Sequence, residues 1–203
     1  MKGRICIVDD DSAVRDSLAM LLEAAGYSVE AFSDSISFLD AGTGTDCVIL
    51  DVNMPGMDGP ALQEEMLKRA MRLPILFLSG QGTIPITVRT IKAGAIDFLT
   101  KPVDGAVLIG RVEEAMLAGA AMQAKADEER TVAEKLAGLT RREREIMTMA
   151  VEGLTSKEIA QRLAISYRTV EIHRAHIMGK TGAANLMELA HMVLSGAGRN
   201  GKE

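Results

Sequence analysis

The chain has 203 residues, enough for one large domain or two small ones. Apolar residues make up 47% of the sequence and aromatic residues only 3%, so we expect cores built mainly from aliphatic side chains and Met. No apolar run approaches the roughly 20 residues that a membrane-spanning helix needs, and no signal peptide precedes the first strand. These features argue against a membrane protein and predict a cytoplasmic one.

The charge is divided unevenly along the chain, although its net value is only −5. Residues 1–104 contain 9 Lys or Arg against 15 Asp or Glu, whereas residues 139–203 contain 10 against 7. An acidic first part and a basic last part indicate two units with different partners, the basic one suited to a polyanion.

Residues 1–104 alternate short apolar runs with helical patterns. The runs expected to form strands are RICIV, YSVEAF, CVIL, PILFL and AIDFLT. This alternation predicts an α/β doubly wound domain with a five-stranded parallel sheet of the flavodoxin type, whose ligand binds beyond the carboxyl ends of the strands. Cys6 and Cys47 lie in the strand runs, and we expect both to be buried, reduced thiols.

Residues 105–138 read as the last helix of this domain continuing into a helical linker, because they contain no Pro and few Gly. A weak heptad-like stripe runs along them, formed by Leu108, Val112, Ala115, Met122 and Ala126. A dimer seam is one interpretation of the stripe. For its early members, packing on their own domain is the simpler one.

Residues 139–195 are expected to form four helices and no strands. Capping boxes at Thr140–Glu143 and Thr155–Glu158 mark the starts of the first two helices. Ser166 is the expected N-cap of the third helix. The polar tail, residues 198–203, is expected to be disordered.

Polar side chains stand at the carboxyl ends of the expected strands. Asp9 and Asp10 follow the first strand, Asp51 ends the third, Ser79 ends the fourth and Lys101 follows the fifth. Clustered carboxylates cannot all stay ionised without a counter-charge, which a hard divalent cation such as Mg²⁺ supplies. Carboxylates, Mg²⁺, an ammonium group and a hydroxyl together predict a phosphoryl-acceptor site.

A lone Asp at the end of a strand is more often the N-cap of a helix than a functional residue. We interpret Asp11 and Asp58 in this way, since each precedes a helical pattern. For Asp51 the functional interpretation is stronger, because Ser79 and Lys101 stand at two further strand ends.

These residues, in this order and spacing, resemble the receiver domain of two-component response regulators over residues 3 to about 117. The resemblance implies that a sensor histidine kinase phosphorylates Asp51. It also implies a Mg²⁺ site made by Asp10, Asp51 and the main-chain carbonyl of Asn53, with Asp9 contributing directly or through water.

The resemblance further implies that three residues respond to the phosphoryl group. Ser79 is expected to move toward it, Phe98 to rotate inward behind it, and Lys101 to pair with it. The Lys101–Pro102 peptide bond is expected to be cis. Asn53 and Gln81 lie where such domains tune attack by the hydrolytic water, and beyond this turnover of its own phosphoryl group we expect no enzyme activity.

Two of the C-terminal helices, in SKEIAQRLAI and SYRTVEIHRAHI, form a helix-turn-helix by pattern. The outward face of the second helix carries Tyr167, Arg168, Glu171, Ile172, Arg174 and Ala175, with Lys180 at its end. Such a face is able to enter the major groove of DNA. Periodicity alone equally allows a plain four-helix unit with a solvated charged face.

Residues 139–190 resemble the four-helix DNA-binding domain of LuxR-type regulators. Both halves together resemble the NarL/FixJ family, nearer its FixJ branch. On this basis the expected DNA contacts are Tyr167, Arg168, Thr169, Glu171, Ile172, Arg174, Ala175 and Lys180. We interpret His173 as a packed helix residue rather than a metal ligand, and we assign no role to His176 and His191, which have no clustered partners in the sequence.

Membership of this family implies a transcription regulator, most simply an activator, that dimerises on phosphorylation and binds a two-fold-related DNA site. The expected dimer face lies at about Ile84–Leu99, and RNA polymerase is an expected partner. The expected divisions are a receiver domain at 1–117, a helical linker at 118–138, a DNA-binding domain at 139–197 and the tail at 198–203.

Two alternatives remain open. A phosphohydrolase with Asp51 as nucleophile is disfavoured, because Asn53 stands where haloacid-dehalogenase-type phosphatases place a second Asp and no cap domain is present. The other alternative is a regulator with a phosphorylation-independent or protein-contact output. The outward Arg168, Arg174 and Lys180 argue against that alternative.

Overall fold

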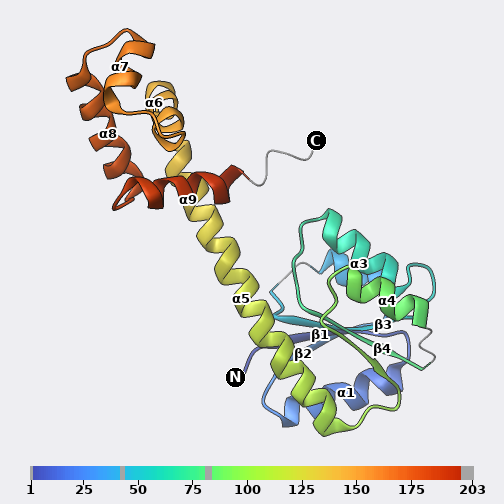
Figure 1. The fold of residues 1–203 in the computed structure, drawn as a ribbon. Coiled ribbons are helices and arrows are strands. Elements are labelled where there is room, and N and C mark those ends of the chain that lie inside the picture. Colours follow the sequence, from blue (N-terminus) through green and yellow to red (C-terminus); the bar gives the residue numbers. More distant parts are fainter. Residues whose placement is uncertain (1, 42–43, 81–83, 198–203) are drawn as a thin grey trace. The chain divides into compact units, whose positions relative to one another are not determined.

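A computed structural model of the chain describes residues 2–41, 44–80 and 84–197. The chain forms two compact units, residues 1–122 and 123–203, with a sheet in the first and helices alone in the described part of the second (Figure 1). Gln81 and the expected tail lie outside the described residues. Within the described ranges, no helix has both the length and the apolar content needed to cross a membrane.

The sheet of the first unit has five parallel strands in the order β2-β1-β3-β4-β5. The strands are β1 Arg4–Val8, β2 Ser28–Phe32, β3 Cys47–Asp51, β4 Ile75–Ser79 and β5 Asp97–Thr100. Every residue of β3 and β4 is buried, as expected for a parallel sheet that carries helices on both faces. The predicted doubly wound sheet is therefore confirmed, with β3 at its centre between β1 and β4.

Helices cover both faces of the sheet (Figure 1). One face packs against α1 Ser12–Ala24 and α5 Gly105–Ala137, whose Leu22 and Leu108 are fully buried. The other face packs against α2 Ser35–Asp40, α3 Gly59–Lys68 and α4 Ile84–Lys92. Cys6 and Cys47 are buried free thiols, one in the core of each face, as predicted.

Acidic side chains start two of these helices. Asp11 accepts hydrogen bonds from the backbone N–H groups of Ala13 and Val14 at the N-terminus of α1. Asp58 accepts one from Ala61 at the N-terminus of α3, at 2.8 Å. Both residues are therefore helix caps, as predicted, because each satisfies backbone donors that the first turn leaves unpaired.

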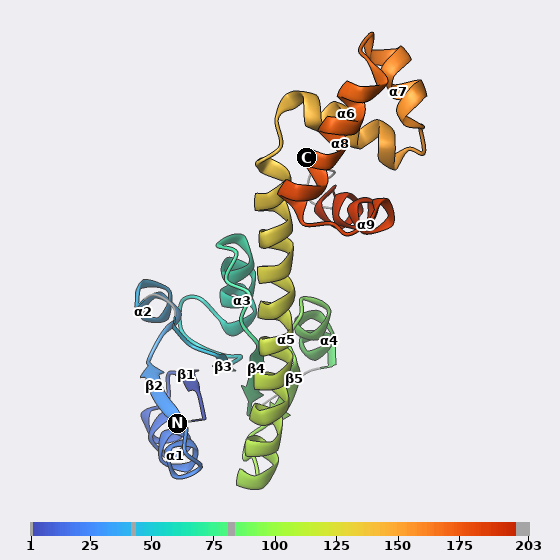
Figure 2. The ribbon, with the colours of Figure 1, turned by 90° about the vertical axis from the view of Figure 1, so that its left-hand side faces the viewer.

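Helix α5 runs without interruption through 33 residues (Figure 2). The early members of its heptad-like stripe, Leu108, Val112 and Ala115, are fully buried in the core under the sheet. Packing on their own domain is thus confirmed for them. Met122 is exposed, so a dimer seam further along the helix stays a prediction.

The second unit contains four helices after α5 in its described part, as predicted. They are α6 Arg141–Val151, α7 Ser156–Leu163, α8 Tyr167–Thr181 and α9 Leu186–Ala197. The two capping boxes and the Ser166 N-cap are present as predicted. A core of its own holds this unit together, formed by Leu139, Ile146, Ile159, Val170, Ile177 and Leu189.

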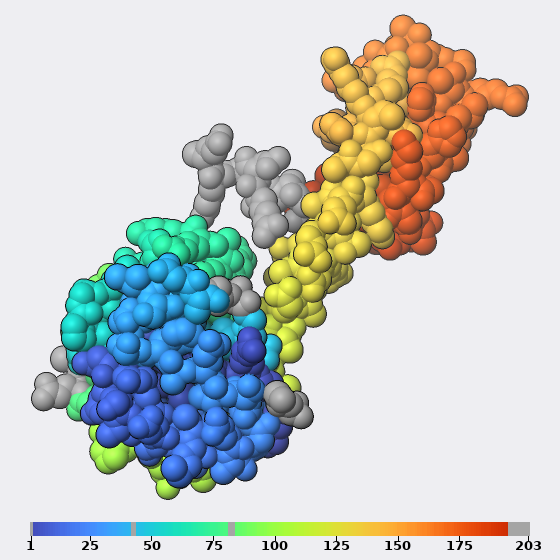
Figure 3. All heavy atoms as spheres, turned by 180° about the vertical axis from the view of Figure 1, so that it is seen from behind, coloured from blue at the N-terminus to red at the C-terminus, as the bar shows by residue number. Residues whose placement is uncertain are grey.

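Seen as spheres from behind, the early elements of the first unit, in blue, form a closely packed surface (Figure 3). The core beneath that surface is aliphatic with a few aromatic rings, of which Phe38 and Phe77 are fully buried. Each unit thus has a hydrophobic core of its own, as expected of two small domains. These cores consist mainly of aliphatic side chains and Met, as the composition of the sequence predicts.

Candidate functional site

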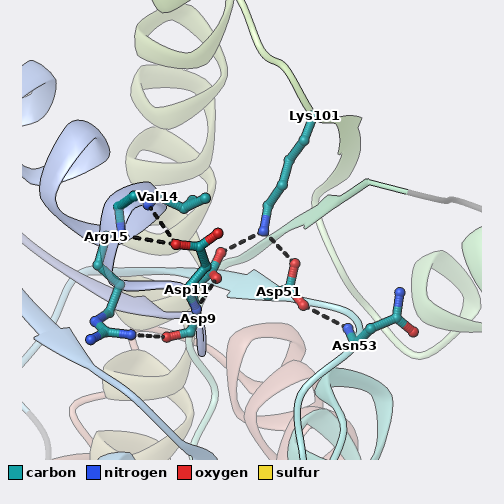
Figure 4. A network of polar contacts seen from close by, with 8 residues as sticks. Asp9, Asp11, Val14, Arg15, Asp51, Asn53 and Lys101 are labelled. Carbon is teal, nitrogen blue, oxygen red and sulfur yellow. Dashed lines mark hydrogen bonds and ion pairs between the residues drawn. The ribbon is translucent and has the colours of Figure 1, made fainter.

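Three charged side chains meet at the carboxyl edge of the sheet. Asp9 follows β1, Asp51 ends the neighbouring β3, and Lys101 follows β5. The Lys101 Nζ atom lies 2.6 Å from Asp9 Oδ2 and 2.5 Å from Asp51 Oδ1, between the two carboxylates (Figure 4). The strand order thus brings together side chains that are up to 92 residues apart in the sequence.

Backbone groups fix the orientation of both carboxylates. The N–H of Asn53 donates to Asp51 Oδ2 at 2.7 Å, and the N–H of Asp11 donates to Asp9 Oδ1 at 3.0 Å (Figure 4). The guanidinium of Arg15 donates to the backbone carbonyl of Asp9 at 2.7 Å. Asp9 is 1% exposed and Asp51 6%, so both acids are held inside the protein, near its surface edge.

Burial and the neighbouring charges act on the two ionisable partners in different ways. Burial raises the pKa of Asp51, and the neighbouring Asp9 adds to this, while Lys101 acts against it. Burial acts to lower the pKa of Lys101, but its hydrogen bonds to Asp51 and Asp9 prevail and raise it. The site therefore holds a firmly charged ammonium between two acids that need a cation close by.

The residues present fit a hard divalent cation. The carboxylates of Asp9 and Asp51 lie close enough together to share the Lys101 ammonium, and carboxylate oxygen is the donor that Mg²⁺ prefers. Asp10 is exposed and follows Asp9 directly in the chain. That Asp10 binds the ion directly, and Asp9 directly or through water, stays a prediction.

Ser79 and Phe98 occupy the neighbouring strands. Ser79 ends β4 and is fully buried, and its backbone carbonyl accepts a hydrogen bond from the Lys101 N–H at 2.8 Å. Phe98 in β5 is half-buried and stacks on Phe77, with the ring centroids 6.2 Å apart. The Lys101–Pro102 bond is cis, as predicted. The movements expected of Ser79 and Phe98 stay predictions.

Two residues that support the site, Arg15 and Gly59, were not predicted from the sequence. Arg15 stands in the first turns of α1, and nothing in its local pattern indicates the contact with Asp9. Gly59 begins α3, and a Cβ atom there would lie 2.2 Å from the backbone oxygen of Asp51. The Asp58–Gly59 pair was a signal for this close approach, since Gly often stands where two backbones nearly touch.

The expected DNA-contact residues lie along α8 or at its end. Those that are exposed are Tyr167, Arg168, Glu171, Ile172, Ala175 and Lys180, whereas Thr169 and Arg174 are half-buried. Two of the basic side chains also bond within their own unit. Arg174 donates to the Ser156 hydroxyl at 3.1 Å, and Lys180 lies 2.7 Å from Glu143 Oε2.

One statement about the histidines was wrong. His176 was predicted to lack clustered partners, but one ligand atom each of His176, His173 and Glu143 lie within 4.8 Å of one another. The reason is the packing of α6 on α8, which a local sequence pattern does not show. His173 is half-buried in α8, and it belongs to the same group of potential metal ligands.

Comparisons with known proteins agree with both halves of this arrangement. Residues 5–113 match the family described as response regulator receiver domain, and residues 137–193 match bacterial regulatory proteins of the luxR family. The chain is 42% identical over 190 residues to the transcriptional regulatory protein FixJ of Azorhizobium caulinodans, which covers 93% of this chain and 90% of that protein.

Two solved structures are also similar to the chain. The response regulator StyR has a TM-score of 0.81 at 36% identity, covering 94% of this chain and 98% of that one. Full-length FixJ from B. japonicum has a TM-score of 0.60 at 39% identity, covering 97% and 98%. The matched families are transcription regulators rather than catalytic enzymes. The chain therefore belongs to the response regulator family, with a receiver domain followed by a LuxR-type DNA-binding domain, and is homologous to FixJ and other transcriptional regulators.

Proposed function

We propose that this chain is a cytoplasmic regulator switched by phosphotransfer from a sensor histidine kinase to Asp51. The observation that carries the proposal is the position of Lys101, whose ammonium lies between Asp51 and Asp9 at the sheet edge. We assign residues 1–117 to the receiver domain, 118–138 to the helical linker and 139–197 to the DNA-binding domain. Phosphorylation promotes dimerisation and sequence-specific DNA binding, and thereby regulates transcription, most simply by activation through RNA polymerase.

The transfer exchanges one bond at phosphorus for another. An oxygen of the Asp51 carboxylate attacks the phosphorus of the kinase's phosphohistidine, so that an O–P bond forms and the P–N bond breaks. The bonding electron pair stays on the imidazole nitrogen, and the ring, which carries one proton on its other nitrogen, leaves as a neutral imidazole. Hydrolysis of the acyl phosphate by water later returns the Asp51 carboxylate and inorganic phosphate.

Each residue of the site has a proposed part in this exchange. Lys101 holds its ammonium where the phosphoryl oxygens arrive, and Ser79 offers them a hydroxyl. The Phe98 side chain rotates inward when Ser79 moves toward the phosphoryl group. Mg²⁺, when bound, neutralises the negative charge that gathers on the oxygens. Its proposed ligands are Asp9, Asp10, Asp51 and the main-chain carbonyl of Asn53.

The proposed dimer face lies on α4 and β5, at about Ile84–Leu99. Helix α4 exposes three large apolar side chains, with Ile84 81% exposed, Val88 45% and Ile91 41%. Apolar side chains gathered on one exposed surface support a contact with a second copy of the chain. Two copies bring two α8 helices to a two-fold-related DNA site.

The proposed DNA face consists of Tyr167, Arg168, Thr169, Glu171, Ile172, Arg174, Ala175 and Lys180. The Lys180–Glu143 and Arg174–Ser156 contacts give two of these side chains a fixed starting position. Arg168 is exposed on the first turn of α8, where recognition helices contact base edges.

The test uses the full chain with Mg²⁺ and beryllium fluoride, a phosphoryl mimic. For the wild type we expect the mimic to raise the mass measured by light scattering to that of a dimer, and to increase the fraction of genomic DNA fragments retained. Asp51→Asn should abolish both responses. Asp40→Asn, an exposed acid at the end of α2, is the matched control and should respond as the wild type does.

An Asp51→Asn variant that responds like the wild type would show that Asp51 is not the acceptor. An output by protein contact alone predicts DNA binding that is absent or insensitive to salt. Phosphate contacts instead make the affinity fall steeply as salt rises, so a titration with NaCl on mixed duplexes separates the two outputs.

A further inference from the structure

The second unit contains a cluster of metal-ligating side chains away from the phosphoryl-acceptor site. We call it the α6–α8 cluster, and it consists of Glu143 in α6 and of His173 and His176 in α8. One ligand atom of each residue lies within 4.8 Å of those of the other two. The two histidines are three positions apart on one helix, so both project toward the same side.

One imidazole nitrogen of this cluster lacks a hydrogen bond. His173 Nδ1 is buried and has no hydrogen-bond partner among the described residues. A buried polar atom left in this state costs about 1–3 kcal/mol. The two simplest ways to satisfy the imidazole are a hydrogen-bonded water and a metal ion.

Glu143 is a carboxylate held in the charged form. Its hydrogen bond from Lys180 and then that from the backbone N–H of Thr140 lower its pKa to about 2. Both bonds are made to Oε2, at 2.7 Å and 2.8 Å. The Thr140 side chain adds a further hydrogen bond to this carboxylate, so Glu143 is held as an anion at the contact between α6 and α8.

We propose that the α6–α8 cluster binds one divalent transition-metal ion of the Zn²⁺ type. The ligands are one nitrogen each from His173 and His176, one oxygen from Glu143, and a water molecule. Two imidazoles and one carboxylate, with the fourth position open to water, are a regular donor set for Zn²⁺.

The ligand atoms have to approach one another when the ion binds. Zn²⁺ bonds of ~2.1 Å place tetrahedral ligand atoms ~3.4 Å apart, whereas here they lie within 4.8 Å. His176 is exposed and His173 is half-buried, so rotations of these two side chains bring their nitrogens toward Glu143. Glu143 is 3% exposed and stays where the capping box holds it.

Binding joins α6 to the helix that carries the proposed DNA contacts. The ion contacts one residue of α6 and two of α8, and the unfolded chain has no such preformed site. A ligand that binds only the folded form raises its stability by mass action. The α6–α8 cluster thus gives the DNA-binding domain a stability that depends on the metal concentration, whether or not Asp51 is the phosphoryl acceptor.

The experiment measures Zn²⁺ binding to the full chain without an affinity tag. A chromophoric chelator competes for Zn²⁺, and excess Mg²⁺ occupies the oxygen ligands of the receiver site. We expect the wild type to take one equivalent of Zn²⁺ and to melt at a higher temperature with it. His176→Asn should weaken binding by more than roughly tenfold, since even the loss of a group behind a ligand costs that much.

The chain offers a matched control in the third of its three histidines. His191 lies in α9, outside the cluster, so His191→Asn should bind Zn²⁺ as the wild type does. Circular dichroism without metal checks that both variants are folded, as expected for substitutions of exposed residues. Equal binding by the wild type and His176→Asn, or no bound equivalent in the wild type, would overturn the proposal.

Discussion

At the scale of single residues, Lys101 balances two acids that could not otherwise stay buried and charged side by side. Its ammonium lies within 2.6 Å of an oxygen of each, and it is largely buried itself, with a side chain that is 21% exposed. Removal of one member of such a group leaves an uncompensated charge behind, which is far more harmful than the loss of a surface ion pair.

Replacement of this lysine should therefore destabilise the chain when Mg²⁺ is absent. We expect Lys101→Met to lower the free energy of unfolding of the receiver domain by about 3 kcal/mol. Mg²⁺ should then raise its melting temperature by more than it raises that of the wild type, because the ion replaces the missing positive charge. Calorimetry with and without Mg²⁺ measures both effects.

Lys68→Met is the control for this change. Lys68 lies on the surface of α3, 3.6 Å from Glu65, with a side chain that is 72% exposed. Its loss should change stability by less than about 0.5 kcal/mol. A Lys101→Met variant as stable as Lys68→Met would show that Lys101 does not balance Asp9 and Asp51.

Glu143 makes the DNA-binding domain sensitive to acid. Its pKa is lowered to about 2 in the folded chain, whereas in an unfolded chain it is about 4.3. A group with a lowered folded pKa contributes its full stabilisation above the unfolded value, and loses it as the pH falls toward the folded value. We expect Glu143→Gln to cost about 2 kcal/mol at pH 7.

The cost of Glu143→Gln should shrink as the pH falls from 5 toward 2. Hydrogen exchange of the α6 and α8 amides measures the local stability of this domain separately from that of the receiver domain. Glu152→Gln, at the exposed C-cap of α6, should have little effect at any pH. A cost of Glu143→Gln that is constant over this range would contradict the assignment.

At the scale of helices and strands, local chemistry decides where elements begin. The N-caps at Asp11, Asp58, Thr140, Thr155 and Ser166 were all predicted from the sequence and are all present. A cap acts over three or four residues, so the sequence around it contains the whole cause. The same holds for the strand cores, whose apolar runs bury both faces.

The third acid of the Asp9–Asp11 run should matter to α1 and not to the metal. Asp11→Ala should lower the free energy of unfolding by about 1 kcal/mol, because it removes the acceptor for two backbone N–H groups. Asp11→Ser keeps a side-chain acceptor and should therefore retain most of this stability. Neither change should alter the Mg²⁺ affinity, measured by titration calorimetry, whereas Asp10→Asn should weaken it. A loss of Mg²⁺ affinity in Asp11→Ser would make Asp11 part of the metal site.

Contacts between distant elements could not be predicted in the same way. That Asp9, Asp51 and Lys101 converge followed from the rule that parallel strands present their carboxyl ends at one edge. That Lys101 touches both acids depends on the order of β1, β3 and β5 and on a rotamer, which no local pattern contains. His176 was missed for a related reason, since its partner Glu143 lies on another helix.

At the scale of the whole molecule, the exposed apolar side chains of α4 are the expected site of self-association. We expect Val88→Glu to keep the chain monomeric in beryllium fluoride and Mg²⁺, because it places a charge in the middle of the proposed face. Phosphorylation of Asp51 itself should be unaffected. Analytical ultracentrifugation of the treated variant measures the outcome.

Met20→Glu is the matched control for the dimer face. Met20 is 73% exposed on α1, on the opposite side of the sheet from α4, so the same change there should leave the dimer intact. If Val88→Glu dimerises as readily as Met20→Glu, then the contact between copies lies elsewhere.

The position of Lys101 also determines which anionic partner its ammonium keeps when Asp51 is modified. Because the Lys101 ammonium contacts both Asp9 and Asp51, it still has one carboxylate partner if its contact with the other is lost. In the proposed phosphorylated state, Lys101 exchanges its contact with Asp51 Oδ1 for one with the phosphoryl oxygens, and its contact with Asp9 gives it a partner during that exchange. We therefore expect the buried Lys101 ammonium to keep at least one anionic partner throughout phosphorylation.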